Sequence, residues 1–156
     1  MLGGAIYTTP TKEIYPEFWN TAPVERGIIR HSYALLGELD GTTISYDKQS
    51  SGETYEAYSV TRAKWDRWCA QQAEEASAVL VKETLVKEIL KEGNRIIGVK
   101  TDTGEEFFSK IVIIADGVNS ILAKQLGFRK DIKPEHVALS IKEVLSIPKE
   151  AIEDRF

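Results

Sequence analysis

The most informative run in this sequence is residues 111–120, IVIIADGVNS. Five consecutive apolar residues open it, and a continuous rather than alternating apolar pattern is typical of a strand buried on both faces of a parallel sheet. Asp116 and Gly117 then predict a turn, and Asn119 or Ser120 can cap the helix that follows. The run therefore predicts a buried strand, a tight turn and a helix N-terminus.

A turn of this kind can hold phosphate or ribityl oxygens. Gly117 allows a ligand to approach the backbone closely, the helix N-terminus offers free N–H groups, and Asp116 can accept hydrogen bonds from hydroxyls. The same residues also fit an ordinary strand-to-helix turn in which Ser120 is the helix cap and Gly127 follows the helix C-terminus. Both interpretations stay open at this point.

A second informative stretch, residues 58–68, predicts a strand that leads into a helix over residues 62–77, with Thr61 as its N-cap. One face of this helix carries Trp65, Trp68, Cys69, Ala73 and Ala76. Arg62 lies at the helix N-terminus, which favours anions over cations. A cation at that position fits either an anionic ligand or a solvated surface arginine.

The remaining pattern predicts an antiparallel sheet with hairpins. Expected strands span residues 25–39, 42–46, 55–60, 78–81, 85–90, 95–101, 105–108 and 137–145, and a surface loop is expected at residues 49–52. Turns are expected at Asp40-Gly41, around Gly93 and at Thr103-Gly104, with a final helical turn after Pro148. The expected fold class is α+β or α/β.

Composition and charge exclude several function classes. Of the 156 residues, 42% are hydrophobic and 28% are charged, which is within the globular range. A net charge of −4 argues against a general nucleic-acid binder, and the single cysteine, Cys69, excludes an internal disulfide and a cysteine-ligated cluster. His31 and His136 have neither triad nor zinc-ligand spacing. No apolar run approaches the length of about 20 residues that a spanning helix needs.

Seven stretches carry a resemblance to a known family: Gly3-Gly4 and residues 22–26, 58–68, 72–76, 115–123, 133–138 and 152–156. They resemble FAD-dependent oxidoreductases with the glutathione-reductase-like flavin fold. Within that group they are most similar to electron-transfer oxidoreductases of the FixC type, relatives of electron-transfer flavoprotein:quinone oxidoreductase. The resemblance implies a partial FAD-binding fold, with parallel strands, a β-hairpin excursion and part of an antiparallel substrate-domain sheet.

The resemblance also implies a set of FAD-binding residues: Arg62, Leu85, Val86, Asp116, Gly117 and Ser120. By this resemblance Arg62 would face the flavin, and the strand at Leu85 and Val86 would lie along the adenine. Asp116, Gly117 and Ser120 would belong to the motif beside the ribityl and pyrophosphate groups. No metal site is implied and no catalytic residue is identified. Ala123 stands where aromatic hydroxylases have an arginine, which weakens a monooxygenase interpretation, and Ser77 replaces a glycine usual in the family.

The Gly-x-Gly-x-x-Gly unit with which this family holds the FAD pyrophosphate has no counterpart in this sequence. We therefore expect an internal piece of a longer flavoprotein. In that protein, residues 1–60 would belong to an antiparallel substrate sheet, residues 61–130 to the FAD-binding domain, and residues 131–156 to the return toward the sheet. On this hypothesis the chain alone binds FAD weakly or not at all and is inactive.

The implied function is electron transfer through FAD between an electron-transfer flavoprotein and a ferredoxin-like iron–sulfur protein or a quinone. The implied location is the cytoplasm or the inner face of the membrane. Two alternatives stay open: a geranylgeranyl or other isoprenoid reductase, and a flavin-free binding module on the same scaffold. The sequence also leaves open peripheral membrane contact and oligomerisation through exposed sheet edges.

Overall fold

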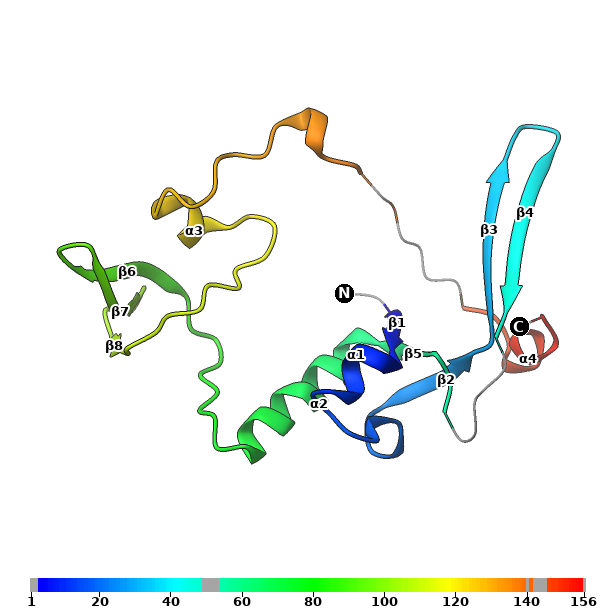
Figure 1. The fold of residues 1–156 in the computed structure, drawn as a ribbon, viewed down its shortest axis with the longest axis horizontal. Coiled ribbons are helices and arrows are strands. Elements are labelled where there is room, and N and C mark those ends of the chain that lie inside the picture. The colour runs from blue at the N-terminus through cyan, green and yellow to red at the C-terminus, as the bar shows by residue number, and fades with distance from the viewer. Residues whose placement is uncertain (1–2, 49–53, 140, 142–145, 156) are drawn as a thin grey trace. The chain divides into compact units, whose positions relative to one another are not determined.

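The computed structural model describes residues 3–48, 54–139, 141 and 146–155 (Figure 1). The chain divides into two compact units. Unit 1 consists of Met1–Leu80 and Lys142–Phe156, and unit 2 consists of Val81–Ile141. The domain boundaries expected after residues 60 and 130 concern a longer protein and stay predictions.

Unit 1 is built on a three-stranded antiparallel sheet in the order β1 (Gly3–Tyr7), β5 (Ala57–Thr61), β2 (Val24–Ile28). The central strand β5 pairs on both edges, which satisfies its backbone N–H and C=O groups. Gly3 stands opposite Thr61, and a Cβ on Gly3 would lie 2.7 Å from the carbonyl oxygen of Val60. Only glycine therefore allows β1 and β5 to approach this closely.

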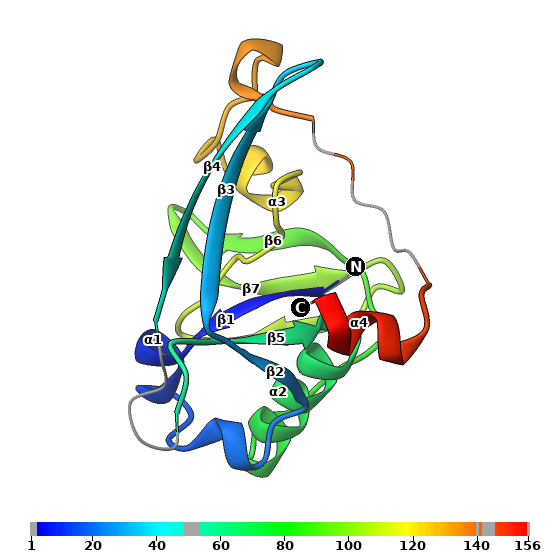
Figure 2. The same cartoon turned by 90° about the vertical axis from the view of Figure 1, so that its right-hand side faces the viewer.

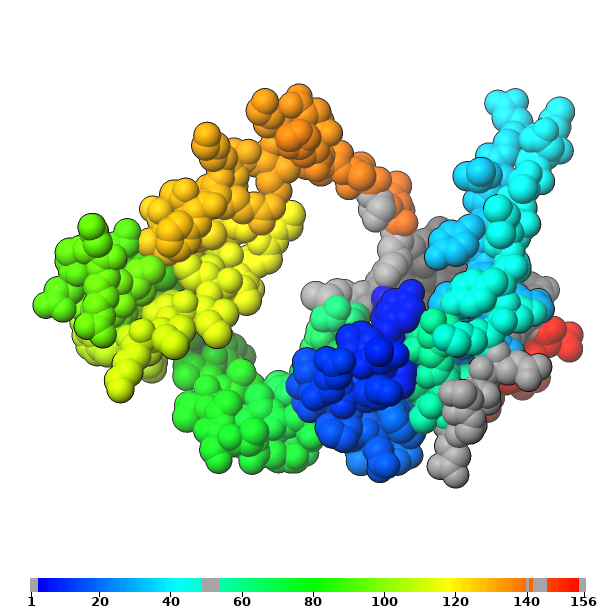
Figure 3. All heavy atoms as spheres, in the orientation of Figure 1, coloured from blue at the N-terminus to red at the C-terminus, as the bar shows by residue number. Residues whose placement is uncertain are grey.

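Unit 1 also contains α1 (Thr8–Lys12), the short helix η1 (Phe18–Asn20), the hairpin strands β3 (Arg30–Leu36) and β4 (Gly41–Asp47), α2 (Arg62–Glu75) and α4 (Lys149–Arg155). Figure 2 shows α2 beside the three-stranded sheet. The β3–β4 pair forms a narrow two-stranded ribbon, drawn in cyan in the space-filling view (Figure 3). The predicted hairpin at Asp40-Gly41 and the helix from Arg62 are confirmed, but residues 25–39 hold two strands rather than one.

The core of unit 1 is aromatic. Phe18 is only 1% exposed, and its ring meets those of Trp19, Tyr58 and Trp65 edge to face, with centroids 5.4, 5.7 and 5.8 Å away. Val60 of β5 completes the same cluster. Edge-to-face contacts add to the large apolar area that such rings remove from water. This cluster holds η1 and α2 against the sheet.

The predicted apolar face of α2 is covered only in its N-terminal part. Trp65 is buried, and Trp68 and Cys69 pack against the core. Ala73 and Ala76 are exposed, although they continue the same helical face. The spacing correctly predicted the helix, but it did not predict where the covering surface ends.

Unit 2 contains an antiparallel sheet in the order β6 (Val86–Glu92), β7 (Arg95–Thr101), β8 (Glu106–Phe108), followed by α3 (Ile121–Gln125) and the short helix η2 (Pro134–His136). Gly93 and Gly104 form the connecting turns with φ of +59° and +92°. Glycine adopts these left-handed conformations without the steric cost that a Cβ brings. Both hairpins predicted for this region are confirmed.

The strand predicted from the most apolar run is absent. Residues 111–115 pair with no described strand, and Ile111 and Ile113 are 79% and 87% exposed. A parallel strand needs a neighbour supplied by a distant part of the chain. All strand pairs among the described residues are antiparallel, so the prediction of a buried parallel strand is wrong here.

Four other expectations concern the connecting segments and the turn after Pro148. Residues 78–81 form no strand and are exposed, and residues 137–139 and 141 are likewise irregular. Residues 140 and 142–145 lie outside the described residues, and so does the whole loop expected at residues 49–52. The helical turn expected after Pro148 is confirmed as α4. The observed class is a mixture of helices and antiparallel sheets.

Candidate functional site

Unit 2 contains an apolar pocket of about 530 Å³. Its walls come from the residues at the start of β6, from β7, from residues 112–116 and from α3. The lining side chains include Leu85, Val86, Val99, Ile114, Asp116 and Leu122. The volume lies within the range of about 300–1,000 Å³ that is usual for small-molecule sites. The pocket therefore combines apolar walls with a carboxylate.

Residues 112–116, which form one wall of the pocket, pack against the rest of unit 2 through one face only. Val112 and Ile114 are half-buried, whereas Ile111, Ile113 and Ala115 are exposed. Such an alternation is typical of an extended segment with one packed face and one open face. The apolar run thus forms a wall of the pocket instead of the two-sided strand that its composition predicted.

Asp116 caps α3. Its Oδ2 accepts a hydrogen bond from the backbone N–H of Leu122 at 2.8 Å. Ser120 was the expected cap, but its Oγ donates to the carbonyl oxygen of Gly117 at 2.8 Å and accepts from Arg129 Nη1 at 2.6 Å. Ser120 has a left-handed φ of +46° and is buried. Ser120 therefore occupies the predicted N-cap position of α3, but its hydroxyl makes no capping hydrogen bond, because the turn itself uses that hydroxyl.

Space lies open beside this turn. Gly117 has a φ of +72°, and a Cβ placed on it would meet no atom within 4 Å. On the helix side, Gln125 Nε2 donates to the carbonyl oxygen of Lys87 at 3.2 Å and so ties α3 to β6. This turn and the hydrogen bond from Gln125 to Lys87 together form the polar edge of an otherwise apolar pocket.

Most of the predicted cofactor residues lie together in unit 2, either on the pocket wall or in the adjoining turn: Leu85, Val86, Asp116, Gly117 and Ser120. Arg62 belongs to unit 1. The pocket is also lined by three residues that the sequence pattern did not indicate: Val99, Leu122 and Gln125. An apolar residue such as Val99 in a strand predicts burial but not which cavity it lines, and nothing in the sequence singled out Gln125.

Arg62 begins α2 and is paired along the helix. Its Nε donates to Asp66 Oδ1 at 2.9 Å, and its Nη2 lies 2.7 Å from the same oxygen. Thr61 occupies the predicted N-cap position of this helix, but its side chain makes no capping hydrogen bond, because its Oγ1 donates to Glu25 Oε1 at 3.2 Å. Lys64 Nζ donates to the same Glu25 oxygen at 2.8 Å and lowers the pKa of that carboxyl.

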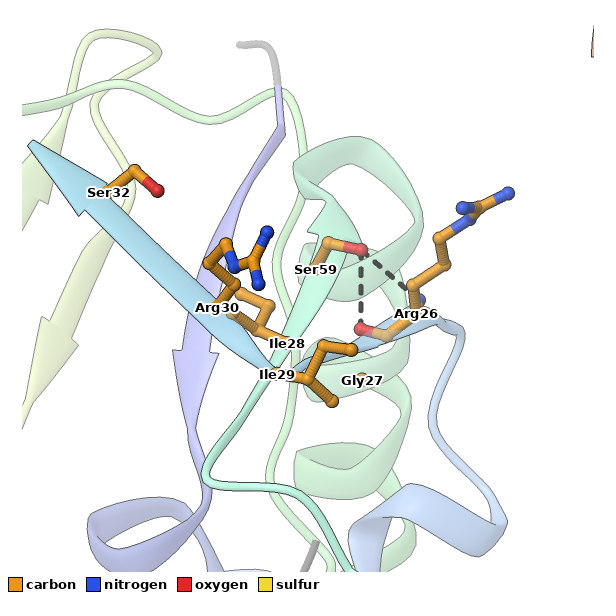
Figure 4. A pocket seen from close by; sticks show the side chains of 7 residues that line it. All are labelled: Arg26, Gly27, Ile28, Ile29, Arg30, Ser32 and Ser59. Carbon is orange, nitrogen blue, oxygen red and sulfur yellow. Dashed lines mark hydrogen bonds between the residues drawn. The ribbon is translucent and has the colours of Figure 1, made fainter. Parts of the chain in front are cut away.

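Unit 1 holds a pocket of about 560 Å³ lined by β2, β3 and Ser59 of β5 (Figure 4). Its guanidinium groups already have partners, since Arg26 binds Glu153 and Arg30 donates to both Asp47 oxygens at 2.6 and 2.8 Å. Arg30 also lowers the pKa of Asp47. Figure 4 shows the Arg26 side chain directed away from Ser59, whose Oγ bonds the Arg26 backbone. With its charges paired, this pocket is a weaker candidate than the one in unit 2.

The remaining reactive groups give no further site. Burial raises the pKa of the Cys69 thiol, and burial together with Cys69 raises the pKa of the neighbouring Tyr15 hydroxyl. Both groups are therefore poorer nucleophiles than usual at neutral pH. Within the described ranges, no cluster of His, Cys, Asp and Glu is suited to a metal ion. Among the helices of those same ranges, none has the length and apolarity to cross a membrane.

Comparison with known proteins gives consistent matches. The family described as Glucose inhibited division protein A matches residues 29–145, more than half of the chain. Protein FixC is 41% identical over 155 residues in Escherichia coli (strain K12) and 33% identical over 157 residues in Azorhizobium caulinodans, covering 99% of this chain in each case.

A third relative is YdiS of Escherichia coli (strain K12), described as a probable electron transfer flavoprotein-quinone oxidoreductase. It is 35% identical over 158 residues and covers 100% of this chain. The chain spans 36% of the length of each of these relatives. The resemblance to the FixC type that the sequence indicated is confirmed.

Proposed function

The chain belongs to the Glucose inhibited division protein A family, and from this premise we propose that it is part of an FAD-dependent oxidoreductase with the glutathione-reductase-like flavin fold. The similarity to FixC and to YdiS supports an electron-transfer role. The proposed reaction passes electrons between an electron-transfer flavoprotein and a quinone or a ferredoxin-like iron–sulfur protein. FAD, when bound, supplies the redox chemistry, and the protein supplies binding and orientation.

The unit 2 pocket is the observation that carries this proposal, because its residues suit the nucleotide end of FAD. The apolar side chains of Leu85 and Val86 can pack against an adenine ring. Asp116 lies at the polar edge, where a carboxylate can accept hydrogen bonds from sugar hydroxyls. The open space beside Gly117 leaves room for the chain of a bound nucleotide.

Asp116 has two roles in this proposal. One carboxylate oxygen, Oδ2, already accepts the Leu122 N–H and holds the start of α3. A carboxylate has lone pairs for about four hydrogen bonds, so the same group can cap the helix and accept a ligand hydroxyl. Gln125 supports the arrangement by tying α3 to β6 beside the pocket. Binding thus depends on apolar walls and one acceptor.

Asp116→Asn tests the proposal most directly. Asparagine caps a helix about as well as aspartate, so this variant keeps the Leu122 hydrogen bond and loses the anionic acceptor. We expect several-fold weaker FAD binding with α3 intact. The measurement is a titration of the chain with FAD up to millimolar concentration, followed by amide NMR because the expected affinity is weak.

Asp131→Asn is the matched control, because it makes the same charge change in unit 2 at an exposed carboxylate paired with Lys124. Removing a negative charge should leave the binding of an anionic ligand unchanged or strengthen it. Equal affinities for the two variants, or FAD-induced shifts confined to residues outside the pocket, would contradict the proposal.

A further inference from the structure

Unit 2 contains another pocket, the basic pocket, in the segment that follows α3. Its volume is about 550 Å³, within the range of about 300–1,000 Å³ that is usual for small-molecule sites. Val118, from the turn before α3, forms one wall, and residues 129–132 and 136–138 form the others. The basic pocket shares no lining residue with the apolar pocket described above, so it is a separate feature of unit 2.

Arg129 is held in the basic pocket by a neutral partner. Its Nη1 donates to Ser120 Oγ at 2.6 Å. Ser120 is only 4% exposed, and its hydroxyl also donates to the carbonyl oxygen of Gly117 at 2.8 Å. A guanidinium has five N–H donors, so one hydrogen bond to a hydroxyl leaves most of them available and leaves the positive charge uncompensated. The Arg129 side chain is therefore oriented by the turn but not neutralised.

The carboxylate that lines the basic pocket is already paired with a cation that does not line it. Asp131 Oδ1 lies 2.7 Å from Lys124 Nζ, and this lysine lowers the pKa of the Asp131 carboxyl. Among the described residues, neither Arg129 nor Lys130 forms an ion pair. The chain as a whole has a net charge of −4, so two unpaired cations in one pocket do not follow from its composition.

The other acid of this segment lies outside the basic pocket. Glu135 Oε1 is 3.4 Å from Lys133 Nζ and 4.0 Å from His136 Nε2. His136 lines the pocket, whereas Glu135 does not. The histidine adds a ring that can donate a hydrogen bond, and no second carboxylate reduces the positive charge of the pocket.

We propose that the basic pocket binds a small oxyanion, a ligand with a phosphate or a carboxylate group, through Arg129 and Lys130. The planar guanidinium matches two oxygens of such a group, and the hydrogen bond to Ser120 reduces the side-chain entropy that binding costs. The apolar walls at Val118, Ile132 and Val137 can contact the carbon part of the ligand. This site goes beyond the proposed function and does not depend on it.

The first experiment titrates the chain with inorganic phosphate and, separately, with succinate, followed by amide NMR. Chloride keeps the ionic strength constant, so that general screening does not change. We expect saturable shifts at Val118 and at residues 129–132 and 136–138. Tighter saturation by phosphate assigns a phosphate ligand, and tighter saturation by succinate assigns a carboxylate.

Two results of these titrations would overturn the proposal. One is a set of shifts that does not saturate or that spreads equally over exposed cations outside the basic pocket. The other is a set of shifts centred on Leu85, Val86 and Leu122, which would place the anion in the apolar pocket. Neither result decides the proposed function, because Asp116→Asn and FAD test that separately.

Arg129→Gln measures the contribution of the guanidinium, and we expect a loss of about tenfold or more in affinity for the anion that saturates. Arg129→Lys keeps the charge but not the planar fork, so its affinity should be intermediate. Arg95→Gln is the matched control, because it removes one exposed positive charge from unit 2 outside the basic pocket. Equal losses in R129Q and R95Q would show that binding follows overall charge and would overturn the proposal.

Lys130→Gln keeps the proposal testable if Arg129→Gln disturbs the fold, which would appear as amide shifts throughout β6, β7 and β8. Lys130 forms no ion pair among the described residues, so its replacement should leave the structure unchanged. We expect a loss of about threefold in affinity for the same anion, because one of two cations is removed. An unchanged affinity in K130Q would contradict the role of the second cation and overturn the site as proposed.

Discussion

In unit 1 the large buried side chains are apolar and mostly aromatic: Phe18, Tyr58, Val60 and Trp65. In unit 2 the buried residues among those described are small or polar: Gly98, Thr101 and Ser120. The difference follows from layering, because apolar side chains leave water where two surfaces face each other. In unit 1, η1 and α2 face the sheet, whereas in unit 2 a single sheet is covered in part by residues 112–116 and α3.

This comparison indicates different sources of stability and different uses of apolar surface. Unit 1 depends on packing of its aromatic core. Unit 2 depends more on hydrogen bonds within its sheet and turns, and it keeps an apolar pocket open. Exposed apolar surface of this kind is characteristic of ligand and protein contacts. The following predictions test whether the two units differ in this way.

The largest effect should come from the unit 1 core. Phe18→Ala removes the ring at the centre of the cluster with Tyr58 and Trp65, so we expect a loss of about 3–5 kcal/mol in the free energy of unfolding. Urea denaturation followed by residue-resolved NMR measures it in each unit, because all three tryptophans lie in unit 1 and their fluorescence does not report on unit 2. Phe128→Ala in unit 2 is the control, since this ring is 74% exposed and should change stability by less than about 0.5 kcal/mol. Similar losses in both variants would contradict the comparison.

An intermediate effect is expected at the buried hydroxyl of unit 2. Thr101 Oγ1 accepts the backbone N–H of Glu105 at 3.0 Å and lies 2.8 Å from Thr103 Oγ1. Thr101→Val keeps the shape but removes this acceptor, and we expect a loss of about 1–3 kcal/mol. Amide hydrogen exchange at Glu105 measures the local effect. Thr103→Val, which changes an exposed residue of the same turn, should cost clearly less. A neutral Thr101→Val would show that hydrogen bonding does not support unit 2.

The smallest effect is a pH dependence. Hydrogen bonds from Tyr46, at 2.8 Å, and from Lys48 lower the pKa of the Glu56 carboxyl below its ordinary value of 4.5. A carboxyl with a lowered pKa in the folded state stabilises the fold above its unfolded pKa, and this contribution disappears as the pH falls through the folded pKa. Glu56→Gln should therefore make unit 1 slightly less stable at neutral pH and flatten the loss of stability below about pH 4.5.

The unit 2 counterpart is Asp131, whose pKa is lowered by Lys124. Asp131→Asn should flatten the acid side of the stability profile only for signals from unit 2, read from residue-resolved NMR between about pH 7 and pH 3. Both carboxyls are solvent-exposed, so both effects should be smaller than that of Thr101→Val. A change in unit 1 signals on Asp131→Asn would mean that the units do not respond separately.

The turns and the start of α2 could be predicted because their signals are local. Gly93 and Gly104 occur where a left-handed conformation is needed, and both adopt it. The spacing of Trp65 and Trp68 predicted which side of the helix packs against the core. Such features depend on residues within a few positions of one another, which a single sequence displays directly.

The strand expected at residues 111–115 could not be predicted reliably, because its apolar residues indicate avoidance of water but not what covers them. The residue that makes the capping hydrogen bond of α3 could not be predicted for a similar reason. Asp116 and Ser120 are both good cap residues, and only the path of the turn directs Asp116 to Leu122 and Ser120 to the Gly117 carbonyl. Spacing alone does not decide between two residues of equal propensity.

By itself, the sequence determined the hairpin turns, the start of α2 and the family resemblance, since these depend on neighbouring residues or on whole matching stretches. Only the tertiary structure decided that Leu85 and Val86 share a pocket wall with Ile114 and that Asp116 both lines that pocket and caps α3. The reason is that a cavity is defined by elements that come together from distant parts of the chain. Their packing depends on shape and on the available second surface, neither of which is encoded by residue type at a single position.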